Sequence, residues 1–81
     1  MITDSVINWI REHCQQVPPD KPLQEDTPLL DQGWLDSLQI MHLVSHLEKE
    51  HAVSVDVEEM VPENFETAGR VAALIQRLKS A

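Results

Sequence analysis

The sequence has few cysteines, few basic residues and no long apolar run, and each scarcity excludes a class of protein. The single cysteine, Cys14, excludes an internal disulfide and a zinc site made of several thiolates, and it indicates a reducing, cytoplasmic compartment. The apolar runs are a few residues long, far short of the ~20 residues that span a membrane. Six basic residues stand against 14 acidic ones, and the formal net charge of −8 repels nucleic acids and anionic membranes. We therefore expect neither as a partner, and we expect basic protein surfaces instead.

The length limits what the chain can enclose. Its 81 residues are enough for one small domain with a modest core, which we expect to span residues 1–81. Two lobes with an enclosed active site between them do not fit, so we do not expect an enzyme. Hydrophobic residues make up 42% of the chain, which is enough for a folded core and too many for a disordered tail.

The first apolar stripe at helical spacing predicts a helix over residues 3–16. Its apolar face includes Cys14, which we interpret as a core residue because no positive neighbour would lower the pKa of its thiol. We expect the proline pair at residues 18–19 to end this helix. A long loop then covers residues 18–36, and its large apolar residues should pin it to the helices. These residues are Leu23, Leu29, Leu30, Trp34 and Leu35.

Two further stripes predict helices over residues 37–50 and residues 68–78, the latter with Thr67 as its N-cap. Residues 52–57 alternate between apolar and polar types, but a lone strand cannot satisfy its backbone groups, so we expect an extended connection. One or two short turns should follow within residues 58–65. The predicted fold is all-α, a small bundle of three to four helices with a long loop between helices 1 and 2.

Residues 33–38 (GWLDSL) place Ser37 in the first turn of a helix, directly after the long loop. Unpaired amide groups and the positive end of the helix dipole favour an attached phosphate there. A second interpretation needs only local structure, because Asp36 followed by Gln39 is a common capping pattern. Ser37 would then be part of a helix cap, and the chain would be a non-catalytic adaptor that binds other proteins. These six residues alone leave both interpretations open.

The wider pattern resembles the acyl carrier protein family, including its relatives that carry amino acids. The likeness covers nearly the whole chain, including the helix order and the loop length. Residues 62–67 (PENFET) also resemble a stretch seen in free-standing members. The matching residues are Thr27, Leu29, Gly33, Leu35, Asp36, Ser37, Leu38, Ile40, Leu43, Val44, Leu47 and Glu48.

The resemblance implies that Ser37, with Asp36 as its acidic neighbour, carries a covalent 4′-phosphopantetheine arm. A phosphopantetheinyl transferase would attach the arm from coenzyme A, usually with Mg²⁺. The thiol of the arm would hold an acyl or aminoacyl group as a thioester and present it to partner enzymes at a high effective concentration. We expect a monomer that catalyses nothing itself.

The resemblance also makes the helix after Ser37 the docking surface for these enzymes. The residues that we expect to contact partners are Leu38, Gln39, Met41, His42, Glu48 and Trp34. For Trp34, a role as a loop anchor is the simpler explanation. Gln39 and His42 stand where carriers of fatty-acid synthesis are typically acidic, and Lys49 interrupts the later acidic run. Fewer negative charges weaken docking to strongly basic partners. A dedicated pathway is therefore favoured over housekeeping fatty-acid synthesis. The carrier would be loaded by an adenylating ligase, or it would serve a small polyketide or amino-acid-modifying route.

His42, His46 and Glu50 share a helix face at spacings of four residues. Two histidines at this spacing bind zinc when further ligands converge on the same point. The sequence offers no third strong ligand and no accompanying catalytic motif. We therefore expect neither a metal site nor a metal-dependent hydrolase.

Overall fold

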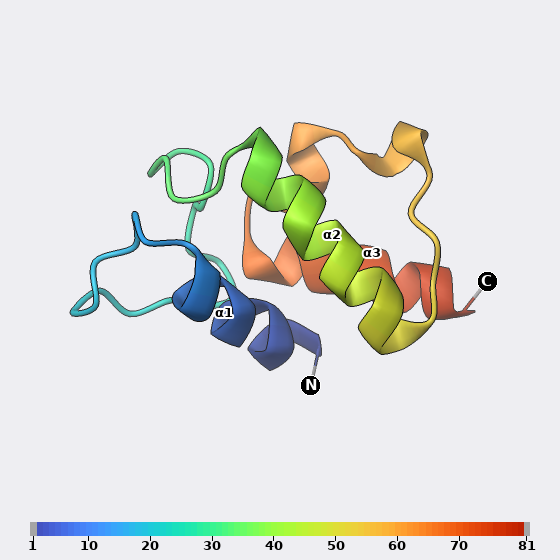
Figure 1. Cartoon of the computed structure of the whole chain (residues 1–81), viewed down its shortest axis with the longest axis horizontal. Coiled ribbons are helices and arrows are strands. Elements are labelled where there is room, and N and C mark those ends of the chain that lie inside the picture. The colour runs from blue at the N-terminus through green and yellow to red at the C-terminus, as the bar shows by residue number, and fades with distance from the viewer. Residues whose placement is uncertain (1, 81) are drawn as a thin grey trace.

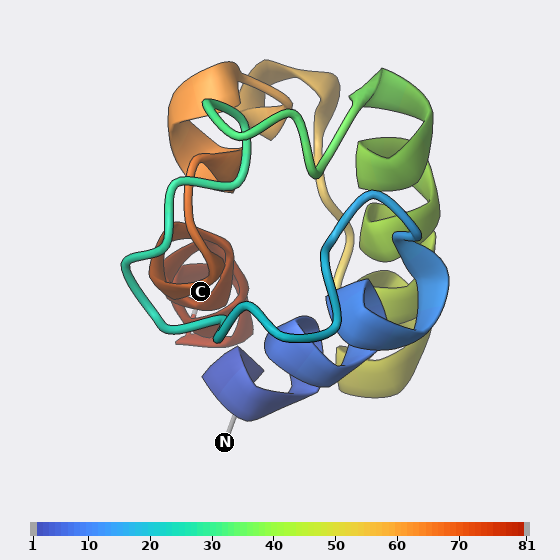
Figure 2. The ribbon, with the colours of Figure 1, turned by 90° about the vertical axis from the view of Figure 1, so that its left-hand side faces the viewer.

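The computed structural model describes residues 2–80, which fold into an all-helical bundle (Figures 1 and 2). Its elements are α1 (Ile2–His13), α2 (Ser37–His51), η1 (Val57–Glu59), η2 (Pro62–Phe65) and α3 (Ala68–Ser80), where η denotes a 3₁₀ helix. α1 packs most extensively against α3, and α2 passes in front of α3 in Figure 1. The predicted fold class is confirmed. None of the helices in the described part is long and apolar enough to cross a membrane.

The predicted end of the first helix, at about residue 16, is wrong because the chain turns before it reaches the prolines. α1 ends at His13, although Cys14 N still donates a helical hydrogen bond at 2.9 Å. Val17 N then donates to Cys14 O at 3.3 Å in a tight turn that buries both residues. The Arg11 guanidinium donates to Pro18 O at 3.1 Å and ties the loop back to the helix.

The other two helices lie close to their predicted bounds. α2 ends one residue later than expected, where Ala52 adopts a left-handed conformation (φ 54°, ψ 46°) and its N–H donates to Glu48 O. α3 follows the predicted N-cap, since Thr67 Oγ1 accepts a hydrogen bond from Arg70 N at 3.1 Å. Residues 53–56 form no strand, and η1 and η2 supply the predicted short turns.

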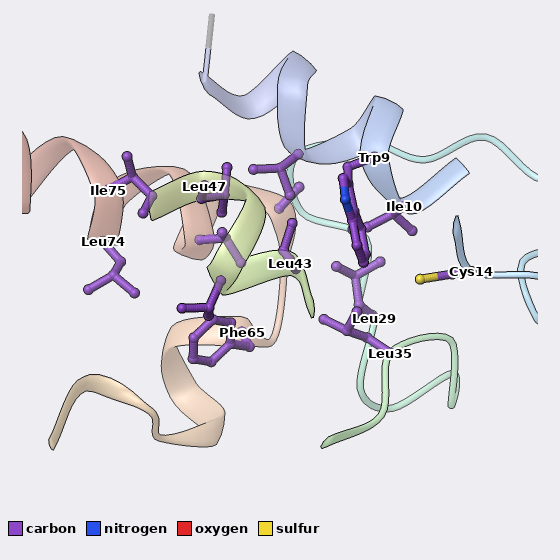
Figure 3. Close-up of a cluster of buried hydrophobic side chains, with 14 of the residues drawn as sticks. Trp9, Ile10, Cys14, Leu29, Leu35, Leu43, Leu47, Phe65, Leu74 and Ile75 are labelled. Carbon is purple, nitrogen blue, oxygen red and sulfur yellow. The ribbon is translucent and has the colours of Figure 1, made fainter. Parts of the chain in front are cut away.

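The core is one cluster of apolar side chains from every α-helix, from η2 and from the long loop (Figure 3). The loop contributes Leu29 and Leu35, so the prediction that its apolar residues pin it to the helices is confirmed. Cys14 is also buried in this cluster, and burial together with the nearby Asp36 carboxylate raises the pKa of its thiol. A buried thiol of this kind is a poor nucleophile, which agrees with the predicted core role.

Two backbone hydrogen bonds, called here the loop staple, fasten the long loop to the start of α3. Leu29 N donates to Glu66 O at 2.8 Å, and Gly69 N donates to Glu25 O at 2.9 Å. A side chain at position 69 would disturb the staple, because its Cβ would lie 2.7 Å from Glu25 Cγ and 3.1 Å from Glu25 O. The staple thus holds in place the segment that leads into α2.

Candidate functional site

Ser37 is the first residue of α2, and its side chain is exposed. Its neighbours make the helix cap. Asp36 Oδ1 accepts a hydrogen bond from Gln39 N at 2.9 Å, and Gln39 Oε1 accepts one from Asp36 N at 3.1 Å, which completes a capping box. The Ser37 hydroxyl makes no hydrogen bond within residues 2–80. The cap therefore does not need this hydroxyl.

A pocket of about 430 Å³ opens beside Ser37, between α2, the end of the long loop and the 3₁₀ helices. It is lined by Leu30, Leu35, Asp36, Ser37, Ile40, Met41, Met60, Val61, Pro62 and Phe65. A group attached to Ser37 would find space beside this largely apolar surface. It would also lie at the end of α2 where the helix dipole favours negative charge.

Three of the predicted docking residues lie on the surface near Ser37. Leu38 and Met41 are 62% and 60% exposed, which is unusual for such large apolar side chains, and His42 is exposed one turn beyond Leu38. These residues are free to contact a partner.

The other three predicted docking residues have internal partners. Gln39 completes the cap, and its Nε2 donates to Gln16 Oε1 at 3.0 Å. Glu48 Oε2 accepts from Val55 N at 2.8 Å and so fixes the connection after α2. Trp34 is partly buried and packs against the core, as a loop anchor does. Their side chains therefore stabilise the fold around the site.

The sequence analysis did not identify Val57 as an exposed apolar side chain, although it is 84% exposed. The alternation at residues 53–57 predicts the same environment for its three valines and so gives no signal for this exposure. Val53 and Val55 are partly buried against the core, whereas Val57 is not. The alternation stops at η1, where the chain turns and Val57 faces solvent.

Glu50 of α2 joins this helix to α1 and also pairs with a histidine of its own helix. His46 Nε2 lies 2.7 Å from Glu50 Oε2, and Ser5 Oγ donates to Glu50 Oε1 at 2.6 Å. The Ser5 hydrogen bond, followed by the charges of His46 and His51, lowers the pKa of the Glu50 carboxyl. Over residues 2–80, no group of three or more His, Cys, Asp or Glu side chains is placed to hold a metal ion.

A helical bundle with a free serine at the start of its second helix is the arrangement of a carrier protein. The family model described as "Phosphopantetheine attachment site" matches residues 8–76. The chain therefore belongs to the phosphopantetheine-binding family, whose members carry 4′-phosphopantetheine covalently and serve biosynthesis. Such carriers are generally non-catalytic and work with phosphopantetheinyl transferases and acyl-handling enzymes.

Individual relatives agree with this assignment. The chain is 41% identical over 80 residues to the probable acyl carrier protein PigG of Serratia sp. (strain ATCC 39006), which covers 99% of this chain and 91% of the relative. It is also similar to a chain in a crystal structure described as that of an FAD-dependent dehydrogenase, with a TM-score of 0.76 and 35% identity over 88% of this chain and 99% of that one. The resemblance inferred from the sequence is confirmed, and the adaptor alternative is not favoured.

The start of α2 fits the prosthetic group of this family. Ser37 offers an exposed hydroxyl that no hydrogen bond from the described residues holds, and the first-turn amides of α2 favour a phosphate. When attached, the arm supplies a terminal thiol that carries an acyl or aminoacyl group as a thioester. The chain itself supplies the attachment oxygen and the surface around it.

Proposed function

We propose that Ser37 Oγ is the atom to which the phosphopantetheine arm is attached. The observation that carries this proposal is the separation of roles at the start of α2, where Asp36 and Gln39 form the cap and leave the Ser37 hydroxyl exposed. A phosphodiester on Ser37 would lie next to those N–H groups of the first turn that the cap leaves unpaired in the described structure, and they would stabilise its negative charge. Asp36 stays engaged with Gln39 N, so capping and attachment do not compete.

The attachment is tested by intact-mass analysis after co-expression with a broad-specificity phosphopantetheinyl transferase. The wild type should gain the mass of one arm, whereas Ser37→Ala should gain none and keep the helical circular dichroism spectrum. Ser45→Ala is the matched control, because Ser45 is also exposed on α2 and should leave the mass gain intact. An unmodified wild type beside active transferase and coenzyme A would contradict the proposal.

The carrier acts as a single-domain monomer over residues 1–81 in the cytoplasm, and an adenylating ligase or another acyl-transferring enzyme loads it.

The comparison with solved structures supports one class of enzyme that acts on the carrier after loading. The match covers 99% of a chain from a crystal structure described as that of an FAD-dependent dehydrogenase, so that chain is itself of carrier size. A flavin-dependent dehydrogenase would oxidise the cargo on the arm, with two hydrogens leaving the cargo to reduce the flavin and the thioester unchanged.

The dehydrogenase step is tested on carrier purified from its native host. Intact-mass analysis should find cargo-bearing species that differ by the mass of one or more pairs of hydrogens. Release of the arm-bound cargo and comparison with saturated and unsaturated standards identifies the oxidised position. A carrier that bears a single saturated cargo in every growth phase would contradict this step and leave the attachment proposal standing.

A further inference from the structure

The sulfur atoms of this chain differ in how far solvent reaches them. They belong to one cysteine and three methionines, namely Cys14, Met1, Met41 and Met60, of which Met1 lies outside the described residues. Hydrogen peroxide oxidises a methionine thioether to a sulfoxide, whereas a cysteine reacts as its thiolate. The accessibility of each sulfur and the charge state of the thiol therefore decide where an oxidant acts first.

Cys14 and Met60 are shielded by the core. Cys14 is 2% exposed, and burial together with the nearby Asp36 carboxylate raises the pKa of its thiol, so little reactive thiolate forms. Met60 is partly buried against the core, and its backbone N–H donates to Val57 O at 3.1 Å. Both side chains are thus less accessible to a dissolved oxidant than an exposed methionine.

Met41 is such an exposed methionine, since it is 60% exposed. It follows Ser37 by four positions, or about one turn of α2, and both residues line the same pocket. Met60 lines this pocket from the segment between η1 and η2, which lies along the same upper edge as the first turn of α2 in Figures 1 and 2. Within the described part of the chain, the most accessible sulfur therefore lies beside the attachment oxygen.

Oxidation at this position would change the surface and spare the fold. A thioether is apolar and adapts to varied apolar surfaces, whereas a sulfoxide is polar and accepts hydrogen bonds. In the free carrier, water would solvate the new oxygen because Met41 is exposed. An enzyme that covers Met41 with an apolar surface would strip this water and offer no donor in return, which costs binding free energy.

We propose that Met41 is a site of reversible oxidation, where hydrogen peroxide forms a sulfoxide that weakens the use of Ser37 by enzymes. A lone pair of the Met41 sulfur forms the new S–O bond, and the O–O bond of the peroxide breaks. The departing hydroxide takes the remaining proton and leaves as water, so the sulfur is oxidised and the peroxide is reduced. Methionine sulfoxide reductases reverse the change. The proposal rests on the proposed function, since it concerns the enzymes that act at Ser37.

The test treats the apo carrier with hydrogen peroxide and locates the added oxygen by peptide mass mapping. Met41 should gain one oxygen atom before Met60 or Cys14 does. The KM of a broad-specificity phosphopantetheinyl transferase for the carrier should then rise about tenfold, as expected when part of one methionine no longer finds an apolar contact. Treatment with the two methionine sulfoxide reductases, one for each epimer, should restore the KM.

Two variants at position 41 separate the sulfoxide from other oxidative damage. Met41→Leu keeps an apolar side chain of similar size that peroxide does not oxidise, so its KM should be the same before and after treatment. Met41→Gln introduces a polar side chain without an oxidant and should raise the KM toward that of the oxidised wild type. Met60→Leu is the matched control, and peroxide should raise its KM by the same factor as in the wild type.

The outcomes distinguish this proposal from the proposed function. An untreated wild type that gains no arm overturns the proposed function and the oxidation site with it. A wild type that gains the arm but takes up oxygen first at Met60 or Cys14 overturns the oxidation site alone. So does an unchanged KM after Met41 has been oxidised. A KM that peroxide raises equally in Met41→Leu also overturns it, because the effect then comes from another residue.

Discussion

The two adjacent side chains at the start of α2 should contribute very differently to stability. Asp36→Ala removes the acceptor of the 2.9 Å hydrogen bond from Gln39 N. Loss of an N-cap costs about 1 kcal/mol of unfolding free energy, and loss of its charge beside the helix dipole costs about 0.3–1 kcal/mol more. Ser37→Ala removes an exposed hydroxyl that makes no hydrogen bond in the described structure, so it should change stability by less than about 0.5 kcal/mol.

Urea unfolding of the apo protein, followed by far-UV circular dichroism, measures these differences. Asp36→Asn is the matched control, because it keeps an acceptor oxygen and loses only the charge, and its stability should lie between the other two. Each 1 kcal/mol lowers the Tm of a domain of this size by about 4–8 °C. If Ser37→Ala destabilises the protein as much as Asp36→Ala does, the Ser37 hydroxyl is part of the cap. The conclusion that the cap leaves this hydroxyl available for attachment would then be wrong.

Three further substitutions test the packing around the site. Gly69→Ala should lower the unfolding free energy by about 1–3 kcal/mol, because the new Cβ meets Glu25 of the loop staple, and a more stable variant in urea would refute this. Ala52→Gly should raise the Tm, since glycine adopts the left-handed φ of 54° without a strain of about 1 kcal/mol, and calorimetry checks the direction. Ser5→Ala should raise the pKa of Glu50 by removing the hydrogen bond that lowers it most, as NMR titration of the carboxyl will show. The lowered pKa stabilises the folded protein at pH values above the pKa of the unfolded chain, and this stabilisation is lost as the pH falls through the pKa of the folded protein. The unfolding free energy of the wild type should therefore exceed that of the variant at neutral pH but not in strong acid.

Helical periodicity was sufficient to predict the fold because each helix buries one stripe of apolar residues against the same core. The signals for the start of α2 were also local, since Asp36 and Gln39 lie three positions apart and form the cap without help from the rest of the chain. The end of α1 was predicted less well. The chain turns after His13 and folds back so that Arg11 reaches the Pro18 carbonyl, a contact that periodicity does not encode.

The docking residues show the limit of prediction at the site. Gln39 and Glu48 look like exposed polar residues in the sequence, but they are hydrogen bonded to Gln16 and Val55 in the structure. The first of these partners comes from the other side of the long loop, so only the tertiary fold reveals it. The exposure of Val57 could not be predicted for the same reason, because it depends on how η1 turns.

The loop staple makes the surroundings of Ser37 depend on α3, which is synthesised well after the serine. Glu25 and Leu29 find their partners at Gly69 and Glu66, about forty positions later. Contacts between such distant positions form late, because the intervening chain must first be brought together. A ribosome-bound chain that still lacks α3 therefore lacks these two hydrogen bonds, and the segment before Ser37 acquires its final setting only once α3 has been made.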